Sequence, residues 1–304
     1  MHKSVLLNEC LENLKIKDDL IYVDATLGYA GHSREILKRI KKGFLFAFDQ
    51  DIKAVTYSQK ELSKISSKYE IIKSNFKNMK KELEKRKVFK VDGILFDLGV
   101  SSPQLDEFKR GFSYHQDALL DMRMDLEQSL TAYYIVNNYS YEELVNILKR
   151  YGEERYSKAI ASKIIHERNK KEIRTTLELV ELIKSVVPEK YKRTTHPARR
   201  SFQALRIEVN DELNILEKTL EESIFLLNKG GRLCIITFHS LEERICTKIF
   251  KKYSQVPKEL SKLPNVPKEY QPIIKIIGKY YPTKEEINFN HRARSAKLRV
   301  IEKL

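Results

Sequence analysis

The sequence predicts an α/β fold, with a doubly wound, mostly parallel sheet and a mostly helical insertion. Short apolar runs alternate with helical patterns through the first hundred residues, and this rhythm stops between about residues 105 and 212. A glycine-containing turn also follows the first apolar run, at the place where open α/β sheets bind ligands. A chain of 304 residues is long enough for one large domain with an insertion.

The strands are predicted from seven apolar runs. The first four alternate with helical patterns, which is the rhythm of βαβ units and of a parallel sheet covered on both faces. A helix is expected over 241–253, and a Pro-punctuated linker over 257–272. The predicted strands are 21–26, 44–48, 70–76, 91–97, 230–239, 273–277 and 296–301.

The insertion is predicted to be helical because its apolar residues recur at helical spacing over 141–151, 155–170 and 176–187. Thr175 and Glu178 have the spacing of a capping box at the start of the last of these helices. We therefore expect residues 1–104 and 213–304 to form the core, and residues 105–212 to form the insertion.

The charge of the chain points to a polyanionic partner, most often a nucleic acid, because the formal net charge is +15. Much of the lysine is equally consistent with solvated surface. Arginines indicate the position of a nucleic-acid site better than lysines do, since a guanidinium binds phosphate bidentately. They cluster at Arg193, Arg199, Arg200 and Arg206, and again at Arg292, Arg294 and Arg299.

The cysteines and the hydropathy limit the class of protein. Cys10, Cys234 and Cys246 lie far apart without a C-x-x-C pair, which argues against disulfides and a structural metal site and favours the reducing cytoplasm. No run of eighteen apolar residues is present, so no membrane span is expected.

The turn after the first strand predicts a site for an adenosine ligand. It lies between Asp24 and a helix start and contains Gly28 and Gly31. It lacks the G-x-G-x-x-G pattern, and Asp24 would repel a pyrophosphate but suits a ligand with a cationic end, such as S-adenosylmethionine. Asp49, about twenty residues on, is placed to accept hydrogen bonds from ribose hydroxyls. The alternative is a glycine turn that binds nothing.

The fourth strand ends in a second candidate residue, Asp97, followed by Gly99 and Ser101-Ser102-Pro103. A carboxylate and neighbouring carbonyls at this edge of the sheet could accept the two N–H groups of an exocyclic amine during methyl transfer. The alternative is that Asp97 only caps the turn that follows it.

Several blocks resemble the bacterial small-subunit rRNA (cytosine-N4)-methyltransferases, the RsmH or MraW family, and they cover essentially the whole chain in collinear order. The matching blocks are Asp24-Ala-Thr-Leu-Gly-Tyr-Ala-Gly-His-Ser33, Asp97-Leu-Gly-Val-Ser-Ser-Pro-Gln-Leu-Asp106, Arg110-Gly-Phe-Ser113, Leu120-Asp-Met-Arg-Met-Asp125, Pro197-Ala-Arg-Arg-Ser-Phe-Gln-Ala-Leu-Arg-Ile-Glu-Val-Asn210, Phe238-His-Ser-Leu-Glu242 and Arg292-Ala-Arg-Ser-Ala-Lys-Leu-Arg299.

The resemblance implies a Rossmann-like methyltransferase core with an inserted helical domain and S-adenosylmethionine as cofactor. Phe76 could pack on adenine or simply belong to the core, and His32 could contact the ligand only through its backbone. The implied cofactor-binding residues are Ala30, Gly31, His32, Asp49, Phe76, Asp97 and Gln104.

The resemblance also implies that the substrate is the N4 amine of a decoding-centre cytidine in 16S rRNA, presented as RNA or as the small ribosomal subunit. Arg199 and Arg200 could bind RNA phosphate. Phe112 or Tyr114 could stack on an extruded base, although a hinge between core and insertion is the alternative that the position favours.

One departure concerns catalysis. Many amino-methyltransferases carry an Asp/Asn-Pro-Pro-aromatic loop, whereas this chain has Asp97-Leu-Gly-Val, so a catalytic role of Asp97 is a hypothesis. Cytosine C5 chemistry is disfavoured because no cysteine lies in a Pro-Cys loop. Two alternatives stay open: an N-methyltransferase acting on DNA or protein, and a non-enzymatic RNA-binding protein on the same fold.

Overall fold

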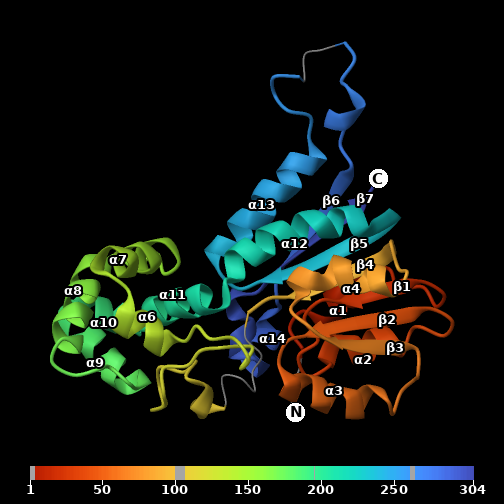
Figure 1. Cartoon of the computed structure of the whole chain (residues 1–304). Coiled ribbons are helices and arrows are strands. Elements are labelled where there is room, and N and C mark those ends of the chain that lie inside the picture. Colours follow the sequence, from red (N-terminus) through yellow and green to blue (C-terminus); the bar gives the residue numbers. More distant parts are fainter. Residues whose placement is uncertain (1–3, 100–106, 195, 261–263) are drawn as a thin grey trace. The chain divides into compact units, whose positions relative to one another are not determined.

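The computed structural model describes residues 4–99, 107–194, 196–260 and 264–304 (Figure 1). The chain divides into two compact units. The core unit comprises Met1–Gly99 and Leu213–Leu304, and the insertion unit comprises Val100–Glu212. The chain therefore leaves the sheet domain once, forms a second compact body and returns.

The core unit is built on a seven-stranded sheet with the order β3-β2-β1-β4-β5-β7-β6. The first five strands are mutually parallel, and β7 runs antiparallel to both β5 and β6. This confirms the prediction of a mostly parallel sheet. The strands are β1 (Ile21–Asp24), β2 (Phe44–Asp49), β3 (Tyr69–Lys73), β4 (Val91–Asp97), β5 (Leu227–Thr237), β6 (Ile274–Tyr280) and β7 (Lys297–Lys303).

The strand order reverses between β1 and β4. From β1 the chain builds outward through β2 to β3, and it then continues on the other side of β1 with β4 and β5. Open α/β sheets bind ligands beyond the carboxyl ends of the strands at such a reversal. Here those ends are Asp24 and Asp97, so the topology itself points to the predicted site.

Both faces of the sheet are covered, which explains why its strands read as continuous apolar runs. In β2, Phe46 and Phe48 belong to the hydrophobic cluster under α4, α12 and α13, whereas Leu45 and Ala47 belong to the cluster under α1 and α2. The helices of the core unit are α1 (Leu7–Leu14), α2 (Gly31–Leu37), α3 (Ile52–Leu62), α4 (Met79–Lys85), α12 (Glu212–Leu226), α13 (Ser240–Ser254) and α14 (Lys284–Phe289).

The insertion unit is helical, with α7, α8, α9 and α11 packed around one another. Capping boxes begin α7 at Ser140 and α9 at Thr175, the second of which the sequence predicted. The helices are α6 (Ala132–Asn138), α7 (Tyr141–Arg150), α8 (Ser157–Arg168), α9 (Thr176–Val186), α10 (Glu189–Thr194) and α11 (Arg199–Asn210).

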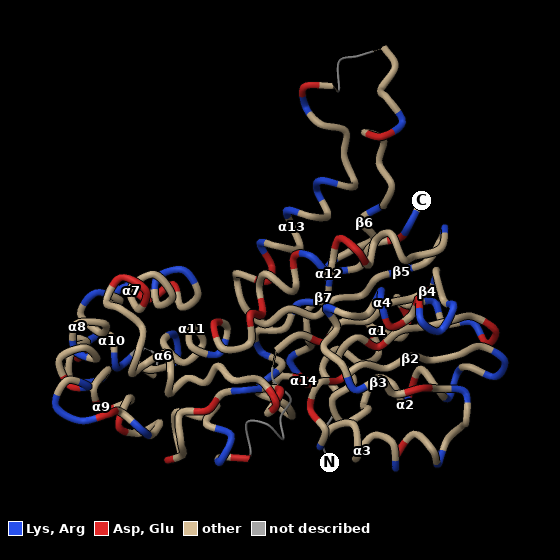
Figure 2. Tube along the Cα trace, in the orientation of Figure 1, with Lys and Arg blue, Asp and Glu red and all other residues tan. Residues whose placement is uncertain are grey.

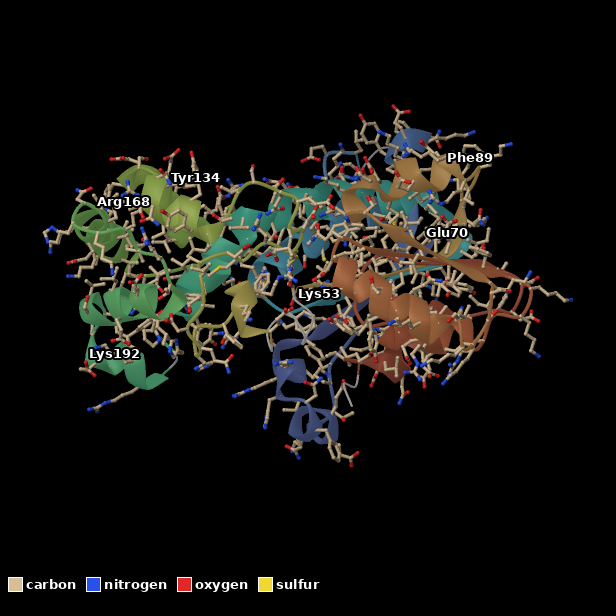
Figure 3. The ribbon with its side chains drawn as sticks, turned by 60° about the horizontal axis from the view of Figure 1, so that its bottom comes forward. Lys53, Glu70, Phe89, Tyr134, Arg168 and Lys192 are labelled. Atoms are coloured by element: carbon tan, nitrogen blue, oxygen red, sulfur yellow. The ribbon has the colours of Figure 1, made fainter. Side chains whose placement is uncertain are left out.

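Basic and acidic residues are distributed along the chain in both units (Figure 2). In Figure 3, for example, the labelled Lys192 extends outward from the insertion unit, where it pairs with Glu189 of its own helix. Among the described residues, no helix is long and apolar enough to cross a membrane.

Candidate active site

Three aspartates end three neighbouring strands of the core unit: Asp24 on β1, Asp49 on β2 and Asp97 on β4. Because the strands are parallel, these carboxyl groups share one edge of the sheet. The structure therefore brings together the acids that the sequence singled out.

Asp24 is held by the turn that follows it. Its carboxylate accepts hydrogen bonds from the Ser33 hydroxyl at 2.7 Å and from the Thr26 N–H at 3.1 Å. Burial nevertheless raises its pKa to about 6, against the lowering effect of these two bonds. Asp24 thus connects β1 to the first turn of α2 through Ser33. Its buried carboxylate places a poorly solvated negative charge at the site.

Asp49 connects the end of β2 to the glycine turn. Its two carboxylate oxygens accept hydrogen bonds from the N–H groups of Gly28 and Asp51, each at 2.8 Å. Burial raises its pKa to about 6, while these two bonds lower it and the charges of Asp51 and Asp24 add to the rise. A carboxylate offers about four acceptor positions, so two remain for hydroxyl donors such as those of ribose.

The turn before α2 is closely packed. Ala30 is fully buried in the left-handed region at φ 60°, directly before the first residue of the helix. A Cβ on Gly31 would lie 1.8 Å from the Ser4 hydroxyl oxygen. A side chain at position 31 would therefore displace the Ser4 hydroxyl, a contact that the sequence alone did not reveal.

The ring of His32 lies at the site. His32 is 5% exposed, with Nε2 at 3.1 Å from the Val5 carbonyl oxygen and Nδ1 at 3.7 Å from Asp97 Oδ2. A proton on Nε2, donated to the Val5 carbonyl, leaves Nδ1 as the unprotonated nitrogen that faces Asp97 Oδ2. The sequence left open a contact through the backbone alone, whereas the structure brings the side chain itself beside the carboxyl group.

Asp97 combines several features of a functional carboxyl group. Its N–H donates to Thr26 Oγ1 at 2.6 Å, whereas its Oδ1 has no hydrogen-bond partner among the described residues. Burial, together with the charges of Asp24 and Glu242, raises its pKa to about 8, although 26% of its side chain stays exposed. A strongly shifted pKa and a free oxygen at a strand reversal mark a functional site.

Glu242 was missed as a site residue by sequence reasoning. His239 follows β5 and caps α13, while the Glu242 carboxylate accepts the N–H groups of Phe238 at 2.7 Å and His239 at 3.2 Å. Glu242 is 2% exposed, and its charge is one of those that raise the pKa of Asp97. The capping-box spacing of His239 and Glu242 was a signal that could have identified this pair.

Phe76 lies in a short turn of 3₁₀-helix after β3. Its ring meets Phe96 edge to face, with the ring centroids 5.6 Å apart and the planes at 90°, and it remains partly exposed. Both the adenine-packing role and the core role therefore stay open. Gln104, Ser101, Ser102 and Pro103 lie outside the described residues.

The insertion unit corrects one expectation about RNA stacking. Phe112 is 6% exposed, with the Arg110 guanidinium 5.9 Å from its ring centroid, so its ring is part of the packing of the unit and not a surface for a base. Tyr114 is partly exposed, but it already stacks on His196, with the centroids 4.4 Å apart and the planes at 20°.

The two candidate arginines of the insertion unit are both exposed. Arg200 donates from Nη1 to the Glu153 carbonyl oxygen at 2.6 Å. For the Arg199 side chain, no hydrogen bond or ion pair is found among the described residues. The structure thus leaves Arg199 available for an anion and gives Arg200 a structural contact as well.

The core site fits S-adenosylmethionine. The Asp97 carboxyl group favours a cationic group nearby, Asp49 keeps acceptor positions for ribose, and Phe76 presents a partly exposed ring. The raised pKa values of Asp24, Asp49 and Asp97 also favour a cationic ligand. A bound cation would stabilise the ionised form of these carboxyl groups.

Comparison with known proteins gives consistent names. The chain is 52% identical over 306 residues to a protein named Ribosomal RNA small subunit methyltransferase H from Exiguobacterium sibiricum, covering 100% of this chain and 98% of that protein. It is 50% identical over 307 residues to a protein of the same name from Clostridioides difficile (strain 630), covering 100% and 99%. A solved structure described as a putative rRNA-methylase from Clostridium thermocellum aligns at 12% identity and TM-score 0.47 over 100% of this chain and 98% of that one. Residues 1–304 match the MraW methylase family, and the chain belongs to that family.

Proposed function

We propose that this chain transfers a methyl group from S-adenosylmethionine to the N4 amine of a decoding-centre cytidine in 16S rRNA. Family membership and the names of the relatives support this activity. The observation that carries it is Asp97 at the reversal of the strand order. Its Oδ1 has no hydrogen-bond partner in the part of the chain that the structure describes, its Oδ2 lies beside His32, and the charge of Glu242 contributes to its raised pKa.

The reaction needs a proton acceptor next to the nucleophile. S-adenosylmethionine supplies, when bound, a methyl carbon activated by a sulfonium. The N4 lone pair forms the new C–N bond, the electron pair of the broken C–S bond stays on sulfur, and one N4 proton leaves. Asp97 Oδ1 accepts a hydrogen bond from that N–H, which holds the amine in line and increases the electron density on nitrogen, and it takes up the N4 proton as the C–N bond forms.

The protonation state of Asp97 couples this step to cofactor binding. With a pKa of about 8, the carboxyl group is mostly protonated at neutral pH. A nearby cation favours the charged form and lowers this pKa. Binding of the cofactor therefore prepares Asp97 as an acceptor, with the ring of His32 lying beside Oδ2.

The substrate partner follows from the same proposal: 16S rRNA, free or within the small ribosomal subunit, in the cytoplasm. The net charge of +15 favours a polyanion. In the insertion unit, Arg199 and Arg200 are exposed, and we assign them to RNA phosphate. The free thiols of Cys10, Cys234 and Cys246 suit a reducing compartment.

A substrate panel tests the proposal. The chain is incubated with methyl-labelled S-adenosylmethionine and, separately, small subunits that lack the modification, naked 16S rRNA, DNA and a protein extract. We expect label in the subunits or the rRNA, and none with Asp97→Asn. Label in DNA or protein alone would overturn the substrate class. Cofactor binding without label anywhere would remove the assignment.

A further inference from the structure

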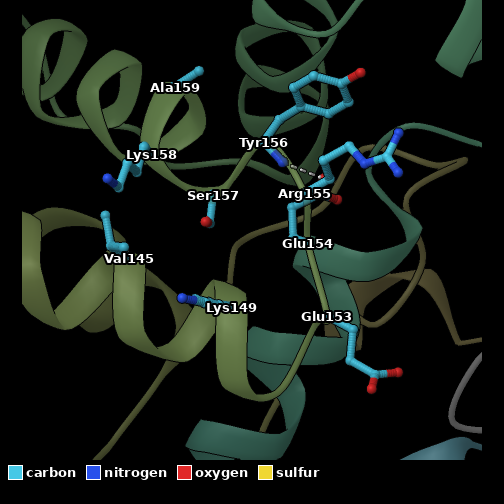
Figure 4. Close-up of a pocket in the computed structure, with 9 residues that line it drawn as sticks. All are labelled: Val145, Lys149, Glu153, Glu154, Arg155, Tyr156, Ser157, Lys158 and Ala159. Atoms are coloured by element: carbon cyan, nitrogen blue, oxygen red, sulfur yellow. Dashed lines mark hydrogen bonds between the residues drawn. The ribbon is translucent and has the colours of Figure 1, made fainter.

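A hollow outside the candidate active site lies within the insertion unit, between the end of α7, the loop over 151–156 and the start of α8 (Figure 4). Its volume is about 650 Å³. No role in the proposed reaction has been given to its lining residues, which are Val145, Lys149, Glu153, Glu154, Arg155, Tyr156, Ser157, Lys158 and Ala159.

Positive charge predominates in this lining. Lys149, Arg155 and Lys158 are exposed, and none of them forms an ion pair with a described residue. Of the two carboxylates, that of Glu154 is occupied, since it accepts the Tyr156 N–H at 2.9 Å and the Tyr191 hydroxyl at 3.1 Å. In Figure 4 the Glu153 carboxylate is directed away from Ser157 and Lys149.

The hydroxyl of a largely buried serine faces the hollow. Ser157 is 5% exposed, yet its Oγ makes no hydrogen bond to a described residue, and Figure 4 shows it directed toward Lys149. It begins α8, a 12-residue helix whose cap residue, Tyr156, gives no side-chain hydrogen bond. The N–H groups of Lys158 and Ala159 also lack an acceptor in the described part of the chain. Such donors at a helix N-terminus bind phosphate.

The backbone behind the hollow is fixed before any ligand binds. A Cβ on Gly152 would lie 2.7 Å from the carbonyl oxygens of both Leu148 and Arg200, so the loop passes closely between α7 and α11. The Arg200 guanidinium holds the same loop through the Glu153 carbonyl at 2.6 Å. The hollow is therefore preorganised, and it adjoins an arginine already assigned to RNA.

We propose that this hollow is a subsite for a backbone phosphate of the RNA substrate, bound by Lys149, Lys158 and the Ser157 hydroxyl at the start of α8. This inference rests on the proposed function. The lysines stand exposed at the rim, an arrangement that suits a strand passing along the surface and is less suited to an enclosed small molecule.

The test measures binding of 16S rRNA to the full chain over a range of KCl concentrations. Lys149→Gln with Lys158→Gln removes both cations that bind the phosphate, so we expect a loss of about tenfold in affinity at low salt. The slope of log K against log salt should fall by about 0.7–0.9, because one phosphate is no longer neutralised. Ser157→Ala should weaken binding by about threefold without changing the slope, because no charge is lost.

A matched control is Lys80→Gln with Lys81→Gln on α4, two exposed lysines of the core unit, for which we expect rRNA affinity and slope close to those of the wild type. Affinity for S-adenosylmethionine should be unchanged in all variants. Unchanged rRNA binding in the Lys149/Lys158 variant, or an equal loss in the control, would overturn the subsite.

A second arm separates the sources of phosphate. Inorganic phosphate is added to the isotope-labelled full chain while the amide resonances of Lys158 and Ala159 are followed. Tight binding of inorganic phosphate with unchanged rRNA affinity in the variant would assign the hollow to a free phosphate compound and overturn the RNA role. A wild-type chain that binds rRNA through these lysines but transfers no methyl group would overturn the proposed function alone. Failure of the wild type to bind rRNA would overturn both.

Discussion

At the scale of single residues, three neighbouring carboxyl groups make negative charge costly at one edge of the sheet. Burial raises the pKa of Asp24 and Asp49 to about 6 and that of Asp97 to about 8. An aspartate in an unfolded chain has a pKa of about 3.9. At pH values between the unfolded and the folded pKa, the folded state binds more protons than the unfolded state, so the free energy of unfolding falls as the pH rises.

This cost predicts the effect of Asp97→Asn on stability. The protonated Asp97 side chain contributes to the free energy of unfolding. This contribution is fully present below about pH 4 and is lost as the pH rises through about 8, whereas asparagine does not titrate. We expect the variant to be more stable than the wild type at pH 8, by about 1 kcal/mol or more, and to lose methyl transfer. Urea unfolding at pH 5 and pH 8 measures the difference.

The matched control is Asp19→Asn, which removes an exposed carboxylate before β1 and should leave the pH dependence as in the wild type. If Asp97→Asn and Asp19→Asn had the same pH profile, Asp97 would not be the costly charge described here.

Cofactor binding should depend on pH for the same reason. Raising the pH from 6 to 8 takes Asp97 from almost fully protonated to about half ionised. The carboxylate attracts a sulfonium, so the Kd for S-adenosylmethionine should fall by about three- to tenfold. S-adenosylhomocysteine shares the adenosine and amino groups but lacks the sulfonium charge, so its Kd should change less. Calorimetric titrations of both ligands at the two pH values decide this. Equal pH dependence for both ligands would contradict the role of Asp97.

Some residue roles could be predicted from the sequence and others could not. Asp24, Asp49 and Asp97 each end an apolar run, and a local pattern is enough to find them. The burial of Phe112 and the approach of the His32 ring to Asp97 depend on segments distant in the sequence, which no local pattern contains.

At the scale of elements, the capping box of α9 offers a direct test. The Thr175 hydroxyl accepts the Glu178 N–H, and the Glu178 carboxylate accepts the Thr175 N–H at 3.0 Å. Thr175→Ala should lower the free energy of unfolding by about 1 kcal/mol, since a helix N-terminus loses its cap. Affinity for S-adenosylmethionine should not change, because the candidate cofactor residues that the structure describes lie in the core unit.

The comparison variant for this test is Thr56→Ala in the interior of α3, where alanine favours the helix and the change should stay within about 0.5 kcal/mol. Urea unfolding curves of both variants give the two values. A cost at Thr56 equal to that at Thr175 would contradict the capping assignment.

The positions of helices and strands could be predicted from the sequence better than any other feature of the structure. Strands 44–48 and 91–97 and helix 176–187 agree with β2, β4 and α9 to within a residue, because apolar periodicity and capping residues are local signals. The position of β7 between β5 and β6 was not predicted, since pairing of strands depends on tertiary contacts.

At the scale of the whole molecule, the division into two units separates cofactor binding from the proposed RNA binding. Arg199→Glu should weaken binding of 16S rRNA by about tenfold while leaving cofactor affinity and thermal stability intact, because no side-chain contact of Arg199 is found among the described residues. Filter binding and calorimetry measure the two affinities.

Arg200→Glu is the informative companion variant, because it also removes the bond to the Glu153 carbonyl and should lower thermal stability. Lys80→Glu on α4 serves as the charge-matched control for rRNA binding. Unchanged rRNA affinity in Arg199→Glu would remove that arginine from the interface.

The most direct test of the central claim identifies the product of the reaction. Small ribosomal subunits lacking the modification are incubated with the chain and methyl-labelled S-adenosylmethionine, and their rRNA is digested to nucleosides for mass analysis. We expect the label in N4-methylated cytidine, and its absence with Asp97→Asn. Label in cytidine methylated at carbon 5, or in another base, would contradict the role of Asp97 as acceptor for the N4 proton.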